Sequence, residues 1–180
     1  MVNPWHDFPV GSNPPELVTA VIEIPRGSRN KYELDKVSGQ FRLDRVLFSA
    51  VHYPGDYGFI PRTLHEDNDP LDIIVSINEP TFPGCQIDCR PLGVLKMLDR
   101  GEPDDKIIAV PAHDPFYNDT FDIADLSQHY LKEVEHFFSI YKDLEGRRVE
   151  IVGWEQCAVA AKVIQDSIVR YEEKYLRVGP

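Results

Sequence analysis

The chain has few basic residues for its length. Its 180 residues include 19 Lys and Arg against 30 Asp and Glu, which gives a formal net charge of −11. Proteins that bind nucleic acids or anionic membranes gather Lys and Arg on one surface, so we expect neither partner. The excess of acids leaves open a protein that binds cations.

Cysteines and long apolar runs are also scarce. Three cysteines, without a basic and apolar leader at the start, predict free thiols in a reducing, cytoplasmic compartment. Cys85 and Cys89 lie close in sequence, but no second Cys or His pair completes a zinc site. No apolar run approaches the ~18 residues that a membrane helix needs. The sequence also contains no P-loop, no G-x-S-x-G elbow and no H-E-x-x-H helix.

The residue pattern predicts an α+β fold in a single domain, 1–180. Fifteen prolines and eleven glycines are scattered instead of pooled into a linker. Strand-like runs come first and helix-like runs follow, without βαβ alternation, which favours a small barrel with helices packed outside. Residues 31–47 resemble a hairpin, and Tyr53 and Tyr57 bracket a tight turn. The expected strands are 17–24, 31–35, 40–47, 71–77, 86–98 (with a bulge near Pro91 and Gly93), 106–110 and 148–152, and the expected helices are 126–144 and 155–175.

The most informative segment is Glu66–Asp72. Asp67, Asp69 and Asp72 fall within six residues before an apolar strand, and alternation places Asp72 on one face with Ile74. A polar turn is one interpretation. Crowded carboxylates otherwise take up protons or bind a cation, and oxygen ligands suit Mg²⁺, Mn²⁺ or Ca²⁺. An EF-hand loop is excluded, because Asp72 stands where its sixth residue must be glycine.

Other polar residues allow both a structural and a functional interpretation. The acidic segment 99–106 is a hairpin loop or a second source of metal ligands, and Lys106 shares a strand face with Asp104. Arg45 interrupts an apolar row, so it marks a bulge or points into a polar site. Metal ions together with cationic side chains are what phosphoryl transfer to water requires. The same two interpretations apply to Glu23, Lys31, Glu33, Tyr53, Tyr57, Tyr141 and Lys142.

Seven sequence blocks, in order, resemble the soluble family I inorganic pyrophosphatases. The segment Asp67–Ile73 is similar to the D-x-D-P-x-D signature of that family. The match runs from about residue 15 to about residue 155. The supporting blocks are Val21–Pro25, Lys31–Glu33, Asp44–Arg45, Tyr53–Gly58, Asp99–Lys106 and Phe137–Lys142.

The resemblance implies an OB-like five-stranded barrel with flanking helices. It also implies hydrolysis of pyrophosphate to two orthophosphates with about three to four Mg²⁺ ions per site, for which Mn²⁺ is a substitute. Asp67, Asp72 and Asp104 would hold the first activating metal, and Asp72 would bridge to the second. A water shared by these two metals would attack directly, and Asp69 would accept its proton as general base.

The resemblance also implies roles for the other residues at matching positions. Asp99 and Asp104 would hold a metal that arrives with the substrate. Glu23 and Glu33 would lie at the rim of the metal cluster. Tyr57 would lie near the metals and the attacking water, and Tyr53 near the substrate. The residues expected to bind phosphoryl oxygens are Lys31, Arg45, Lys106, Tyr141 and Lys142.

One position departs from the family pattern. Many bacterial members carry an acid directly after the residue matching Asp99, whereas this chain has Arg100, so we expect no metal ligand there. The nearby Glu102 is not assigned as a ligand either. The short chain resembles the prokaryotic type, which implies a homohexamer. The sequence of residues 104–110 resembles plant-type enzymes, some of which are not hexamers. Two alternatives stay open: a phosphohydrolase acting on nucleotides or other diphosphates, and a small barrel that binds structural Ca²⁺.

Overall fold

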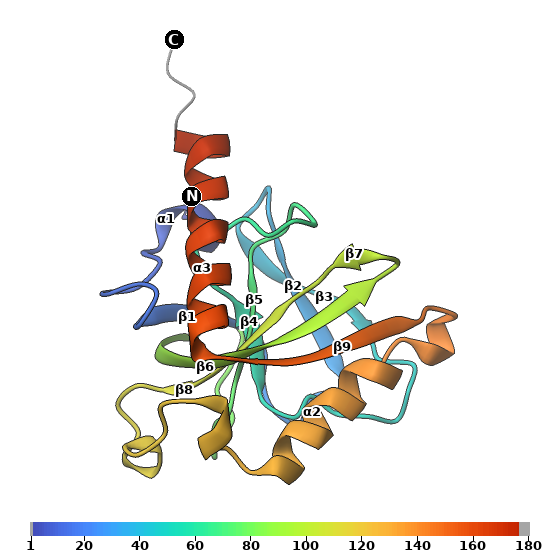
Figure 1. The fold of residues 1–180 in the computed structure, drawn as a ribbon. Helices are drawn as coiled ribbons and strands as arrows, with labels where there is room; N and C mark the ends of the chain where they lie inside the picture. Colours follow the sequence, from blue (N-terminus) through green and yellow to red (C-terminus); the bar gives the residue numbers. More distant parts are fainter. Residues whose placement is uncertain (1, 177–180) are drawn as a thin grey trace.

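The computed structural model describes residues 2–176 and has a mixed β-sheet at its centre (Figure 1). Five of its strands form a closed ring, because the first of them pairs with both the second and the last. Within the ring only the pair β5–β8 is parallel. The α+β class is therefore confirmed. In ring order the strands are β1 (Val18–Ile24), β4 (Asp56–Phe59), β5 (Asp72–Val75), β8 (Lys106–Pro111) and β6 (Gln86–Asp99).

The long strand β6 also pairs antiparallel with two strands outside the ring. A separate two-stranded hairpin contacts the ring at β1. The outer strands are β7 (Glu102–Pro103) and β9 (Val149–Gln156). The hairpin consists of β2 (Asn30–Asp35) and β3 (Gln40–Val46), as predicted.

Two irregularities in strand pairing were expected from the sequence. The register of β6 against β8 shifts between Pro91 and Gly93, which confirms the predicted bulge. In the hairpin, Lys31 pairs with Arg45 but Tyr32 pairs with Leu43, so one residue of β3 is extra. Arg45 therefore lies at a bulge, one of its two predicted interpretations.

Three α-helices and four short helical turns complete residues 2–176. The helix α2 (Gln128–Ile140) contacts β9, and α3 (Cys157–Tyr171) contacts β6 on the other side (Figure 1). None of the helices in this part of the chain is long and apolar enough to cross a membrane. The other helical elements are α1 (Pro4–Asp7), η1 (Pro115–Tyr117), η2 (Ile123–Asp125), η3 (Asp143–Glu145) and the π-helical turn η4 (Glu172–Leu176).

Alternation along β5 distributes its side chains between two apolar clusters. Ile74 packs in the cluster that α2 completes with Phe138. Ile73 and Val75 pack in the cluster that α3 completes with Ile164. Asp72 accepts a hydrogen bond from Tyr57, which packs in the same cluster as Ile74, so Asp72 lies on the face of Ile74, as predicted.

Residues 56–59 form the strand β4, which the sequence pattern did not predict, so the tight turn expected between Tyr53 and Tyr57 is confined to the residues before Asp56. All four residues are buried, and a strand covered on both faces shows no polar alternation. A Cβ on Gly58 would lie 1.9 Å from the carbonyl oxygen of Val21. Glycine is needed there because β1 and β4 approach closely, not because the chain turns.

Both main helices are shorter than predicted. The helix α2 ends at Ile140, and a separate turn follows that leaves Leu144 exposed. The helix α3 begins at Cys157, because β9 continues to pair with β6 up to the preceding residue. With this start, α3 buries Ala160 and leaves Ala158 exposed.

Candidate active site

A cavity of about 500 Å³ opens at the beginning of β5 and β8, between the β2–β3 hairpin and the β6–β7 turn. Its walls are mainly acids, lysines and tyrosines. Twelve of the site residues expected from the sequence line it: Glu23, Lys31, Glu33, Tyr57, Asp67, Asp69, Asp72, Asp99, Asp104, Lys106, Tyr141 and Lys142.

Lys106 lies at the floor of this cavity. The parallel register of β5 and β8 pairs it with Asp72, and its ammonium group contacts the carboxylates of both Asp72 and Asp104. Only 2% of the Lys106 side chain is exposed. Although burial opposes the charge, the two carboxylates raise the pKa of Lys106. Burial opposes ionisation of Asp104, but the charge and hydrogen bond of Lys106, together with the charge of Lys142, lower its pKa.

Asp72 joins the lysine to a tyrosine of the neighbouring strand. The Tyr57 hydroxyl donates a hydrogen bond of 2.6 Å to Asp72 Oδ2. Burial raises the pKa of Asp72, and the adjacent Asp104 acts in the same direction. Burial and the charge of Asp72 also raise the pKa of Tyr57, which keeps the hydroxyl protonated as a donor.

The loop before β5 presents Asp67 and Asp69 to the same cavity. The backbone N–H of Asp69 donates to Asp67 Oδ1 at 3.0 Å, and the His65 N–H donates to the Asp69 carbonyl at 2.7 Å. Burial raises the pKa of Asp67 to about 6, and the charges of Asp72 and Asp69 add to this effect. Lys36, which the sequence analysis did not single out, contacts the Asp69 carboxylate.

Glu23 connects the hairpin to the ring. Its Oε1 accepts a 2.7 Å hydrogen bond from the backbone N–H of Leu34 in β2. Burial, followed by the nearby charge of Asp72, raises the pKa of Glu23 to about 8 in spite of that hydrogen bond. The cavity therefore holds more carboxylates than its own lysines neutralise.

The sequence and fold of the chain match known proteins over most of their length. A family model described as inorganic pyrophosphatase matches residues 20–172. The chain belongs to the inorganic pyrophosphatase family. Inorganic pyrophosphatases of Geobacillus stearothermophilus and Haloferax volcanii are 54% and 49% identical to it, over 88% and 97% of this chain and 96% and 99% of theirs. The crystal structure of inorganic pyrophosphatase from Thermus thermophilus has a TM-score of 0.92 at 44% identity, covering 95% of this chain and 99% of that one.

These matches confirm the family resemblance that the seven sequence blocks carry. They also show that this pyrophosphatase family member is an enzyme. The fold described above is therefore shared with a solved relative over nearly the whole chain.

Two residues expected in the site do not line the cavity of this family member. Arg45 donates two hydrogen bonds of 2.9 Å to the carboxylate of Glu145 and also contacts Asp44. Tyr53 is buried, and its ring packs against Tyr57 at a centroid distance of 5.3 Å. Arg45 is therefore held by an acid, and Tyr53 lies behind Tyr57.

The donor set suits a hard divalent cation. One oxygen of Asp99 binds Lys142 Nζ at 2.7 Å, whereas Asp99 Oδ1 is buried without a hydrogen-bond partner in residues 2–176. In that part of the chain no three of the acids converge as metal ligands, and Asp72, Asp99 and Asp104 each contact a lysine. A buried carboxylate oxygen without a hydrogen-bond partner, among several other carboxylates, is the kind of donor that a hard divalent cation takes.

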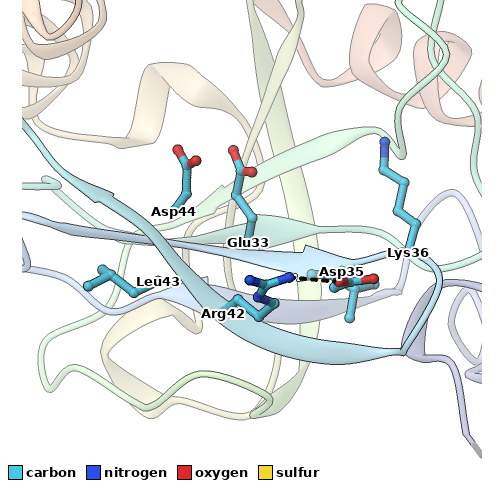
Figure 2. Close-up of a pocket in the computed structure, with 7 residues that line it drawn as sticks. Glu33, Asp35, Lys36, Arg42, Leu43 and Asp44 are labelled. Carbon is cyan, nitrogen blue, oxygen red and sulfur yellow. Dashed lines mark hydrogen bonds and ion pairs between the residues drawn. The ribbon is translucent and has the colours of Figure 1, made fainter.

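A second cavity of about 480 Å³ adjoins the first along the hairpin and shares Glu33, Leu34 and Lys36 with it. Figure 2 shows the carboxylates of Glu33 and Asp44 projecting to the same side of the hairpin.

The first cavity also has lining residues that the sequence analysis missed or left without a role. They are Leu34, Lys36, Pro70, Arg100, Glu102, Pro103 and Arg147. Of these, Arg100 and Glu102 had a signal in the sequence, as the departure after Asp99 and the acid near it, and Pro70 and Pro103 lie inside the family blocks without an assigned role.

Proposed function

We propose that this family member hydrolyses pyrophosphate to two orthophosphates in a Mg²⁺-dependent reaction. The observation that carries the proposal is Lys106, buried between Asp72 and Asp104 at the floor of an acidic cavity. An ammonium group binds phosphoryl oxygens, and carboxylates bind divalent cations. The cavity therefore offers groups for both the substrate and the metal.

Different sets of acids would bind the different metal ions. Asp67, Asp72 and Asp104 would hold the first Mg²⁺, and Asp72 would be shared with a second. Asp99 and Asp104 would hold an ion that arrives with pyrophosphate, giving about three to four ions per site, with Mn²⁺ as a substitute. When bound, the ions would neutralise phosphate charge and make a water molecule more acidic. Glu23 and Glu33 would lie at the rim of the cluster.

Asp69 is the proposed general base. Its side chain is 56% exposed and lines the cavity, so it is accessible to the water that attacks phosphorus. A carboxylate within hydrogen-bond reach of that water accepts its proton as the bond to phosphorus forms. Tyr57 would assist by holding Asp72 in position through their 2.6 Å hydrogen bond.

The cationic and phenolic residues would bind the phosphoryl oxygens. Lys31, Lys106 and Lys142 each contact an acid in the structure, and pyrophosphate would replace that acid as their partner. Tyr141 lines the cavity beside them. Arg45 would have to leave Glu145 to reach the substrate, and Tyr53 would act through its packing against Tyr57.

The test is orthophosphate release from pyrophosphate by the purified protein across Mg²⁺ concentrations, with Asp72→Asn as a matched variant. We expect Mg²⁺-dependent turnover that Asp72→Asn abolishes. An absence of Mg²⁺-dependent turnover would overturn the proposal. Preference for a nucleoside diphosphate in a competition assay would support the alternative phosphohydrolase, and tight Ca²⁺ binding without turnover would support the Ca²⁺-binding barrel.

We also infer how the chain is organised. Residues 1–180 would form one domain, of which 1 and 177–180 lie outside the described residues, and the five-stranded ring would be an OB-like barrel. The protein would be a cytoplasmic homohexamer with no nucleic-acid or membrane partner. Sedimentation velocity of the full chain tests the assembly, and a monomer or dimer would contradict it.

A further inference from the structure

Two arginines that line the cavity have no ionic partner among the described residues. Six cationic side chains line it, and each of the four lysines contacts a carboxylate. By contrast, the exposed guanidinium groups of Arg100 and Arg147 make no hydrogen bond or ion pair within residues 2–176. These two groups can therefore bind an anion without first breaking an existing pair.

The strand register brings both arginines to one edge of the sheet. Asp99 in β6 pairs with Val149 in the antiparallel strand β9. Arg100 follows Asp99 and Arg147 precedes Val149 by two residues, so both lie where these strands end. Lys142, which binds Asp99 at 2.7 Å, connects this edge to the interior of the cavity. The arginines thus line the same cavity as Lys142 and Lys106.

The backbone at Arg100 is unusual for its residue type. Arg100 and Gly101 connect β6 to β7 with φ angles of 54° and 82°, both in the left-handed region. Asn, Asp and Gly are the residues that such a two-residue connection favours. The Arg100 side chain makes no hydrogen bond or ion pair within residues 2–176 that would offset the disfavoured backbone. Strain of this kind beside a reaction cavity is a reason to look for a function of the side chain.

The overall charge of the protein makes an entry site useful. A formal net charge of −11 repels a polyanion at long range. A pair of free guanidinium groups at the cavity mouth offsets this repulsion locally, although Glu102 places one carboxylate near them. Charges at a rim act mainly on the rate of association and on its salt dependence.

We propose that Arg100 and Arg147 form an entry site that captures pyrophosphate at the cavity mouth before it reaches Lys106. This inference rests on the proposed hydrolysis of pyrophosphate. It assigns the two arginines to substrate affinity and leaves the chemical step to the groups deeper in the cavity.

The kinetic test compares a double variant, Arg100→Gln with Arg147→Gln, with the single variant Arg148→Gln. Arg148 is the matched control because it is exposed and adjacent to Arg147 but does not line the cavity. At low salt we expect the KM of the double variant to rise about fivefold, with a smaller change in kcat. Its kcat/KM should also lose much of its salt dependence. A double variant with the KM and the salt dependence of Arg148→Gln would overturn the proposal.

A binding measurement separates this inference from the proposed function. Isothermal titration of the full chain with imidodiphosphate, a non-hydrolysable analogue, should show about fivefold weaker binding by the double variant. The single variant Arg100→Lys, with Arg147 unchanged, should bind the analogue within about twofold of the wild-type affinity, because lysine keeps the positive charge. If the protein does not hydrolyse pyrophosphate, but removal of the two arginines weakens binding of the analogue, only the proposed function fails. Equal analogue affinity in all variants, or no binding by the wild type, overturns the entry site.

Discussion

Tyr57 donates a 2.6 Å hydrogen bond to Asp72 from the neighbouring strand of the ring. The tyrosine ring packs against Phe138 of α2, while the carboxylate also contacts Lys106. A phenol held by apolar packing therefore fixes the orientation of the acid that we propose as a bridging metal ligand. The arrangement depends on β4, the strand that the sequence pattern did not reveal.

Replacing Tyr57 by phenylalanine tests this relationship. Tyr57→Phe keeps the ring packing but removes a donor from a buried carboxylate, so we expect the free energy of unfolding to fall by about 1 kcal/mol. We expect kcat to fall at least about tenfold, because the orientation of Asp72 is loosened. Steady-state kinetics and urea denaturation measure both effects. Tyr53→Phe provides the comparison, and a loss of kcat from Tyr53→Phe but not from Tyr57→Phe would contradict the geometry.

Replacing Lys106 by methionine tests the buried cation. Lys106→Met keeps much of the side-chain length but leaves two mostly buried carboxylates, 23% and 14% exposed, without this partner, which costs about 3 kcal/mol of unfolding free energy without Mg²⁺. Added Mg²⁺ should restore part of this stability, because a bound cation takes the place of the ammonium charge, but should not restore activity.

The control for Lys106→Met is Lys162→Met on α3, where the lysine is 72% exposed and pairs with Asp166. That surface pair should contribute less than about 1 kcal/mol. Urea denaturation with and without Mg²⁺ measures both variants. Equal losses for the two, or a loss in Lys106→Met that Mg²⁺ does not change, would contradict the assignment of Lys106.

The fold could be predicted where one face of a strand differs from the other. The β2–β3 hairpin and the position of Asp72 on the Ile74 face followed from alternation and were confirmed. The strand β4 could not be found this way, because its four residues are all buried. The start of α3 was misplaced for a related reason: its first residues follow a strand whose length is set by pairing with β6, a tertiary contact.

The residue types of the site were predictable, but most of their partners were not. The acids were visible as clusters and as family blocks in the sequence. That Lys106 lies between Asp72 and Asp104 depends on the parallel register of β5 and β8. That Arg45 binds Glu145, 100 residues later in the chain, has no local signal at all. Roles within the site therefore remain predictions that the variants described here test.

Asp69→Asn tests the general base. We expect kcat to fall by about 100-fold or more, because the amide cannot accept the proton from water. Folding should be retained, since the side chain is 56% exposed, and the increase in Tm caused by Mg²⁺ should be similar to that of the wild type. Asp166→Asn on the surface of α3 is the control for loss of a carboxylate in a lysine pair. Normal turnover by Asp69→Asn would show that another group accepts the proton.

Glu23 should couple the stability of the metal-free protein to pH. Burial raises its pKa from the ordinary 4.5 to about 8, so between these values the folded state keeps a proton that the unfolded state releases. The free energy of unfolding must then fall as pH rises through this window. Glu23→Gln retains an acceptor for the Leu34 N–H but cannot ionise, and should therefore flatten the decline. The decline below about pH 6 should persist, because the pKa of Asp67 is also raised, to about 6.

The measurement is urea denaturation in the presence of a chelator at about pH 5, 6.5 and 8, with the exposed Glu150→Gln in β9 as control. Equal slopes for the wild type and Glu23→Gln would rule out Glu23 as the source of the pH dependence. Repeating the series in excess Mg²⁺ supplies an independent check. Metal binding requires ionised carboxylates, so the stabilisation by Mg²⁺ should be larger at about pH 8 than at about pH 6. Because the buried acids lose their protons as they gain a cation, the same cavity should destabilise the free protein and stabilise the metal-bound one as pH rises.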